Sequence, residues 1–254
     1  MNKTIHISAL AILMLLSACS SHYRLTDVSH SRIVVDQSYD VNPDAGAWAF
    51  LTLYKNKVDS VMGPIVGEVA HDMAANRPES DLSNLLTDIF IYMAKEYNEA
   101  PDFAVYNMGG IRAGFAKGKV TYGDVLDVAP FENKICFLTL KGDKVLELFS
   151  QIAQRGGEGV SKGVQMVMTK DGRLVSVRLH GKAIDPDANY RITTIDYLAQ
   201  GNDGLTAFKS GTNLNSPTDE TNNARFVIRD YFLEMYKQGK VIDSKVEGRI
   251  VVEN

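Results

Sequence analysis

The clearest pattern of apolar and polar positions along the chain lies after Pro78. Apolar residues recur there at i, i+3, i+4, i+7 and i+11, the positions of one helical face. Ser80 precedes the run and is a favoured N-cap residue. The spacing predicts a helix with one buried stripe, formed by Leu82, Leu85, Leu86, Ile89 and Met93.

Two further segments show helical spacing. One contains Val145, Leu148, Phe149 and Ile152, and it is followed by two glycines at 156–157, where a helix end favours left-handed backbone. The other begins near Asp219, stops before Gly239, and carries one apolar face, formed by Ile228, Tyr231, Phe232 and Met235. Both segments predict helices.

Short apolar runs bounded by turn residues predict strands. A Lys-Asp-Gly turn at 170–172 joins two of these runs and is a strong signal for an antiparallel hairpin. Strands and helices interleave without a regular βαβ period, so we expect an α/β protein of the α+β type, with a single mixed-sheet domain at residues 41–254. The predicted strands are 103–106, 134–140, 164–168, 174–179, 190–195 and 248–252.

The N-terminal residues differ in character from the rest of the chain. A lysine near the start and an apolar run from Ile7 to Leu16 are typical of an export signal. The run is too short to span a bilayer. The sequence LSAC at 16–19 resembles a bacterial lipobox, which implies cleavage before Cys19 and its lipidation; a plain signal peptide is the alternative.

These features predict a lipoprotein signal peptide at residues 1–18 and a polar, mobile tether at residues 19–40. The protein is then exported and anchored by lipid to a bacterial membrane, on its periplasmic or surface side. Lipidation of Cys19 would leave Cys136 without an intrachain disulfide partner. Because Cys136 lies inside an apolar strand, we expect it to pack as a small hydrophobic residue.

Composition and charge argue against several classes of function. The chain is 45% hydrophobic and 23% charged, and its formal net charge of -4 provides no basic field for a nucleic-acid polymer. Of five histidines, only His71 and His180 fall in the expected domain, and neither has neighbours with metal-ligand spacing. We therefore assign no metal site and no catalytic residue.

A glycine-rich segment at 156–163 looks at first like a phosphate-binding loop. Its lysine follows Ser161 instead of the required glycine, and the segment follows a helix instead of a strand. A flexible helix-to-strand connection is the better interpretation. The residues GVSKG at 159–163 have Gly-x-Ser-x-Gly spacing, but the segment follows a helix, whereas a nucleophile elbow follows a strand and opens a helix, so no nucleophile is assigned.

The remaining candidates are residues suited to binding. In the stretch NMGGIR, Asn107 offers hydrogen-bond donors and an acceptor, and Gly109 and Gly110 permit close backbone approach. Arg112 offers a fork of donors that suits a ribose or a phosphate. Taken alone, the stretch favours a tight turn with a surface arginine.

Two other loops change this interpretation. The stretch PFEN places Phe131 just before a strand, and DYLAQGNDG places Tyr197 and Asp203 just after one. Two aromatic rings can hold a base between their faces, and a carboxylate can accept hydrogen bonds from ribose hydroxyls. Together with NMGGIR, the two loops predict a nucleoside site.

The motifs NMGGIR, APFENK and YLAQGNDG, in this order and spacing, resemble the C-terminal substrate-binding domain of bacterial and animal 5'-nucleotidases, over residues 50–254. The resemblance implies that Phe131 and Tyr197 stack on the base, with Tyr197 standing where the family usually has phenylalanine. It also implies that Asp203 binds ribose and that Arg112 contacts ribose and phosphate.

By the same resemblance, Asn107 matches a base-contacting asparagine and Asn133 a binding asparagine after the Pro-Phe pair. Two departures accompany the match. Arg77 is offset from an upstream arginine of the family, and the 156–163 segment is shorter than its counterpart and lacks an aromatic. The family's dimetal phosphoesterase domain also precedes this domain, and the residues between Cys19 and the matched region are too few to form one.

We therefore expect a lipid-anchored subunit of a split 5'-nucleotidase that binds a nucleoside or 5'-nucleotide. A separate metallophosphoesterase chain would complete it for nucleotide hydrolysis, so no cofactor is expected in this chain and a divalent metal only on the partner. One alternative is a non-catalytic interaction lipoprotein with a decayed pocket. The other is a stand-alone hydrolase with an unrecognised site at Asp203 and Arg112.

Overall fold

The computed structural model describes residues 23–253, so the predictions for residues 1–18 and for Cys19 lie outside the described residues. The chain divides into two units, one ending at Phe50 and the other running from Leu51 to the C-terminus. The predicted boundary at residue 41 stays a prediction.

In the first unit, every described residue is exposed, and a 3-10 helix spans Gln37–Val41. The helix α2 (Ala45–Met62) begins in this unit, continues into the second one and ends directly before Gly63-Pro64, a pair that stops a helix. Among residues 23–253, none of the helices combines the length and apolar character needed to cross a membrane.

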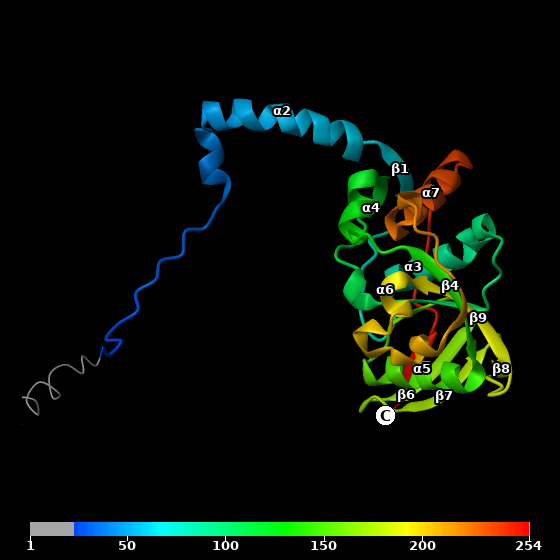
Figure 1. Cartoon of the computed structure of the whole chain (residues 1–254). Coiled ribbons are helices and arrows are strands. Elements are labelled where there is room, and N and C mark those ends of the chain that lie inside the picture. Colours follow the sequence, from blue (N-terminus) through cyan, green and yellow to red (C-terminus); the bar gives the residue numbers. More distant parts are fainter. Residues whose placement is uncertain (1–22, 254) are drawn as a thin grey trace, which may run out of the picture. The chain divides into compact units, whose positions relative to one another are not determined.

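The second unit is built around a five-stranded sheet with the strand order β10-β4-β9-β2-β5. In Figure 1, β4 and β9 run side by side. β2 and β9 are parallel, and the other neighbours are antiparallel. All four residues of β2 are buried, as expected for a strand covered on both faces. The strands are β2 (Phe103–Tyr106), β4 (Ile135–Lys141), β5 (Gly159–Val160), β9 (Asn189–Ile195) and β10 (Thr212–Asn215).

The remaining strands form two smaller sheets. β1 pairs with β3, and the order β11-β6-β7-β8 forms the other sheet, in which β6 and β7 are the predicted antiparallel hairpin. Gly172 has a φ of 80°, so the predicted turn uses glycine where the backbone is left-handed. The strands are β1 (Ile65–Val69), β3 (Gly118–Thr121), β6 (Val164–Thr169), β7 (Leu174–Leu179), β8 (Lys182–Ala183) and β11 (Ile250–Glu253).

The predicted helices are present. In α3 (Asp81–Met93), Ser80 is the N-cap as predicted and accepts a hydrogen bond from the Ser83 backbone N–H at 3.2 Å. The predicted apolar stripe of α3 is buried, and the helix packs on β2 and α7. The other helices are α4 (Tyr122–Val128), α5 (Gly142–Gln154), α6 (Asp196–Ala199) and α7 (Ala224–Lys237), with 3-10 turns at Ala94–Tyr97, Met108–Gly110, Asn202–Gly204, Thr206–Ser210 and Glu220–Asn222.

Two predictions are corrected by the structure. The last helix begins at Ala224 and not near Asp219, because the Ala224 N–H donates to the Asn133 carbonyl at 2.8 Å and ties the chain to another segment. The segment 156–163 is not a flexible connection. It contains β5, which pairs with β2, and it carries a fully buried Ser161 whose hydroxyl accepts from the Ala104 N–H at 2.8 Å.

Cys136 packs in the core as predicted. Its side chain is fully buried on β4, and burial raises the pKa of its thiol to about 12. The thiol is therefore neutral at physiological pH and serves as a small apolar side chain.

Candidate functional site

Three neighbouring strands of the central sheet place the candidate residues at one edge. Ile135 begins β4 and lies opposite Ile195, which ends β9, because these strands are antiparallel. β2 runs parallel to β9, so its end lies at the same edge. The segments before β4, after β9 and after β2 therefore meet, although they are far apart in the sequence.

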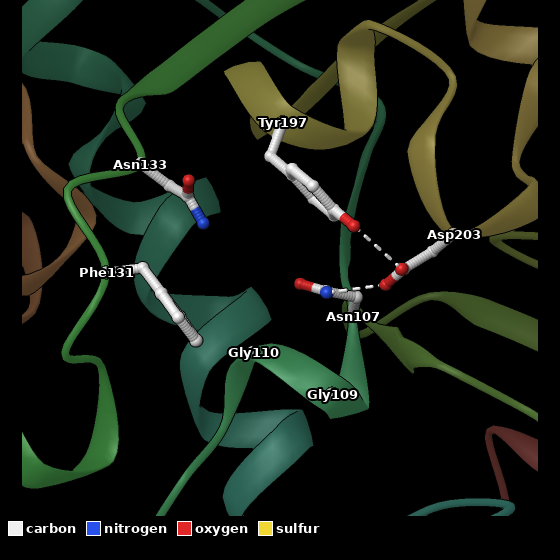
Figure 2. Close-up of a pocket in the computed structure, with 7 residues that line it drawn as sticks. All are labelled: Asn107, Gly109, Gly110, Phe131, Asn133, Tyr197 and Asp203. Atoms are coloured by element: carbon white, nitrogen blue, oxygen red, sulfur yellow. Dashed lines mark hydrogen bonds between the residues drawn. The ribbon is translucent and has the colours of Figure 1, made fainter.

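A cavity of about 220 Å³ lies where these segments meet. Every residue that lines it belongs to the binding residues predicted from the sequence, and Figure 2 shows how their side chains surround the space. The lining residues are Asn107, Gly109, Gly110, Phe131, Asn133, Tyr197 and Asp203. Of the predicted binding residues, Arg112 alone is not among them.

Two aromatic rings flank the cavity. Phe131 is 45% exposed and Tyr197 37% exposed, and Figure 2 shows them on opposite sides of the opening with Asn133 beside them. No ring-to-ring contact joins Phe131 to Tyr197 in the described part of the chain. The arrangement leaves two half-exposed apolar faces available to a flat ligand.

Asp203 is held in a fixed position on the Tyr197 side. Its φ of 55° is left-handed, an uncommon conformation for a residue other than glycine. Its carboxylate accepts hydrogen bonds from the Tyr197 hydroxyl at 3.0 Å and from the Asn107 side-chain amide at 2.7 Å. The hydrogen bond to Asp203 raises the pKa of the Tyr197 phenol, which therefore stays a neutral donor.

Asn107 is 5% exposed and carries a polar atom that the protein itself does not satisfy. Its Nδ2 donates to Asp203, while its Oδ1 has no hydrogen-bond partner among residues 23–253. A Cβ on Gly110 would lie 2.6 Å from this Oδ1, so only glycine leaves Asn107 in place. This buried acceptor is therefore one polar position next to the cavity that has no protein partner among the described residues.

Arg112 lies next to the cavity without lining it. Its side chain is exposed, and its Nη1 donates to the Gly109 carbonyl at 3.4 Å. Within residues 23–253, Arg112 takes part in no ion pair. Its positive charge is thus not neutralised by a neighbouring carboxylate.

A group of charged residues that the sequence pattern did not reveal adjoins Asp203. Arg155 places its Nη2 3.6 Å from Asp203 Oδ2, and both Arg155 and Arg77 form ion pairs with Glu158. Glu158 stands among glycines, a context that usually indicates an exposed loop, so its burial left no signal in the sequence. Arg77, whose role the sequence left open, is one of its partners.

The described residues do not suit a metal centre. No group of three or more His, Cys, Asp or Glu side chains in residues 23–253 could hold a metal ion. His71 lies between two aspartates, 3.4 Å from Asp81 and 3.3 Å from Asp243. None of these three residues lines the cavity. What the cavity offers is stacking, hydrogen bonding and one carboxylate.

Comparisons with known proteins show which family the chain resembles. Residues 62–210, more than half of the chain, match the model of the family "5'-nucleotidase, C-terminal domain". The trifunctional nucleotide phosphoesterase protein YfkN of Bacillus subtilis is 30% identical over 246 residues, covering 89% of this chain and 16% of YfkN. The cell wall protein Lmo0130 of Listeria monocytogenes is 26% identical over 239 residues, covering 84% of this chain and 30% of Lmo0130.

Among solved structures, the 5'-nucleotidase precursor from Thermus thermophilus superposes with a TM-score of 0.71 at 28% identity, covering 82% of this chain and 43% of that one. The chain thus spans less than half the length of the relatives it matches. The α+β fold expected from the sequence agrees with this neighbour. From the family match and the shared fold, the chain belongs to the family of 5'-nucleotidase C-terminal domains.

Proposed function

We propose that the cavity binds a nucleoside or 5'-nucleotide with its base between Phe131 and Tyr197. The observation that carries this proposal is the placement of two half-exposed rings on opposite sides of one cavity, with Asp203 beside them. Stacking on aromatic side chains contributes about 1 to 3 kcal/mol per base and tolerates every base. Asn133, which also lines the cavity, and the free Oδ1 of Asn107 would add polar contacts.

The sugar and phosphate have matching partners. A carboxylate has about four acceptor positions, and Tyr197 and Asn107 each use one on Asp203, so two remain for the vicinal hydroxyls of a ribose. Gly109 and Gly110 let the backbone come close to the ligand. Arg112, exposed and without an ion pair in the described chain, would meet a 5'-phosphate.

In this proposal the chain contributes substrate binding to nucleotide hydrolysis, and a separate metallophosphoesterase chain contributes the divalent metal. The names of YfkN, a nucleotide phosphoesterase, and of the Thermus 5'-nucleotidase support hydrolysis of nucleotides as the shared process. The described residues do not fit a metal centre, so no hydrolytic step is assigned to them. Phosphate release from AMP should need addition of the partner chain. Metal-dependent release by the purified chain alone, lost in Arg112→Ala, would overturn this division.

We also propose that the protein is exported and anchored by a lipid on Cys19. The segment LSAC and the apolar run before it support the anchor, and the name of the Listeria relative, a cell wall protein, supports a place outside the cytoplasm. Metabolic labelling with a radioactive fatty acid tests the anchor. Label should enter the wild type and not Cys19→Ser, and equal labelling of both would contradict it.

Calorimetric titration of the full-length chain in detergent with adenosine and AMP tests the binding proposal. The double variant Phe131→Ala, Tyr197→Ala should lose saturable binding, because each stacked face contributes about 1 to 3 kcal/mol. Tyr236→Ala is the matched control, an exposed aromatic residue that does not line the cavity. Absence of binding by the wild type would overturn the proposal and favour a non-catalytic interaction lipoprotein.

A further inference from the structure

Glu158 is a buried carboxylate with three hydrogen-bond donors directed at it. Its side chain is fully buried. Oε1 accepts from Arg77 Nη2 at 2.8 Å and from Arg155 Nε at 2.5 Å, and Oε2 accepts from the Met108 backbone N–H at 2.5 Å. Each of the two oxygens therefore has at least one charged or backbone donor.

The C-terminal end of α5 brings Arg155 and Arg77 close to Glu158. Arg155 is the C-cap of α5, and Gly157 follows with a φ of 103°. A Cβ on Gly157 would lie 2.3 Å from the Pro78 carbonyl, so the helix end sits directly against the residue that follows Arg77. Both arginines can then reach Glu158. Burying this charge without them would be strongly unfavourable.

The same group connects two walls of the cavity. Met108 follows Asn107 and begins the 3-10 turn that contains Gly109 and Gly110, and its N–H is fixed by Glu158. Arg155 also faces Asp203, with Nη2 3.6 Å from Oδ2. The Asn107 side-chain amide donates to the same Oδ2 of Asp203 at 2.7 Å. Asn107 and Asp203 are therefore linked both directly and through Glu158.

We infer that Glu158 and Arg155 are positioning residues for the sugar end of the bound ligand. Glu158 holds the 107–110 turn directly and, through Arg155, holds the Asp203 carboxylate against Asn107. This inference rests on the proposed nucleoside site. It deepens that proposal, because it assigns recognition of the two ribose hydroxyls to a network built on the buried carboxylate of Glu158. Two opposite pairs of charges form the network, Arg77 and Arg155 with Glu158 and Asp203, so their formal charges cancel.

The network predicts a selective loss that a general structural role would not produce. A ligand with both ribose hydroxyls depends on the placement of Asp203, whereas 2',3'-dideoxyadenosine stacks on the rings without using that carboxylate. Removing Arg155 should therefore weaken adenosine and leave the dideoxy analogue nearly unchanged. Affinity for the analogue also reports that the cavity has folded.

Calorimetry on the full-length chain with both nucleosides tests the inference. Arg155→Gln should weaken adenosine binding about two- to fivefold, the scale of a partly exposed ion pair, because Asp203 loses the positive charge 3.6 Å away. Asp203→Asn should also weaken adenosine binding. The double variant Arg155→Gln, Asp203→Asn should bind adenosine no more weakly than whichever single variant binds it less tightly, because the two residues act as a unit. Arg155→Lys should restore part of the loss. Arg173→Gln, at an exposed ion pair outside the cavity, should change neither affinity.

Glu158→Gln provides a second variant. It should reduce the ratio of adenosine to dideoxyadenosine affinity and lower thermal stability. Its control is Glu99→Gln, which breaks another partly buried arginine pair, with Arg191, and should lower stability while leaving the ratio intact. An unchanged ratio in both Arg155→Gln and Glu158→Gln would overturn this inference alone. Absence of adenosine binding by the wild type would overturn the nucleoside site as well.

Discussion

The two walls of the cavity are supported in different ways. The Tyr197 wall is tied to Asp203 by a side-chain hydrogen bond, and Asp203 is tied in turn to Asn107 and to the buried charges around Glu158. The Phe131 wall lies in an exposed loop, and its neighbours are held from α7, through Arg225 and the Ala224 N–H.

This difference indicates that the two walls have different roles in binding. A wall fixed by directed hydrogen bonds can discriminate between ligands by their hydroxyl groups, because a misplaced partner leaves polar atoms unsatisfied. A wall that offers an apolar face in a more exposed loop can accept any base. Variants in each wall should therefore affect adenosine and dideoxyadenosine differently.

Gly110→Ala should damage the hydrogen-bonded wall most. The new Cβ would lie 2.6 Å from Asn107 Oδ1, so Asn107 must move away from Asp203. We expect a loss of about 1 to 3 kcal/mol of unfolding free energy, the usual cost of overpacking, together with weaker adenosine binding. Urea denaturation measures the loss. In the control Gly109→Ala, the nearest atom would be 3.9 Å away, and equal destabilisation of the two variants would refute the steric explanation.

Arg225→Gln should loosen the other wall. Arg225 donates to the Pro130 carbonyl and to Glu132, both at 3.1 Å, on either side of Phe131. Loss of these bonds should reduce affinity by about 0.5 to 1.5 kcal/mol, and by the same factor for adenosine and for dideoxyadenosine. Calorimetry compares the two ligands, with Arg178→Gln as a control arginine that also donates to a backbone carbonyl. A loss confined to adenosine would contradict the division between the walls.

Tyr197→Phe should have a smaller effect, restricted to the sugar end. The ring still stacks, while Asp203 loses the hydroxyl donor at 3.0 Å. Adenosine should bind more weakly by at most about 1 kcal/mol, and dideoxyadenosine should bind as before. Tyr190→Phe is the control, since that hydroxyl accepts from the Asp185 N–H outside the cavity. A drop in dideoxyadenosine affinity would mean that the hydroxyl positions the ring itself.

Alkaline pH should give the smallest effect. The hydrogen bond to Asp203 raises the pKa of Tyr197 above its ordinary value of 10.0, so the neutral phenol persists where an isolated tyrosine ionises. A raised pKa means that the stabilising contact is fully present below the ordinary value and disappears as pH rises through the higher folded value. Adenosine affinity should stay flat as pH rises through 10.0, the ordinary value, and fall only above it. A fall of the same size in Tyr197→Phe would exclude this phenol as the cause.

Local structure was predictable because it depends on neighbours in the sequence. The spacing of Leu82 to Met93 and the cap at Ser80 determine α3, and β2 was predicted with its observed bounds. The start of α7 was not predictable, because it depends on a hydrogen bond from Ala224 to Asn133 across the chain. The pairing of β5 with β2 was missed for the same reason.

The amino-acid sequence by itself determined α3, α5, most of α7 and the hairpin, whereas α2, α4 and α6 were not predicted. It also identified the residues that line the cavity, with Asn133 identified only through the resemblance to the family. Their motifs consist of glycines, aromatic rings and polar side chains whose chemistry is evident from residue type alone. Only the tertiary structure decided that three strand ends meet at one edge, that Arg112 lies outside the cavity lining, and that Glu158 is buried and linked to Asp203 through Arg155. Strand register and burial depend on contacts between residues far apart in the chain, and no local pattern records them.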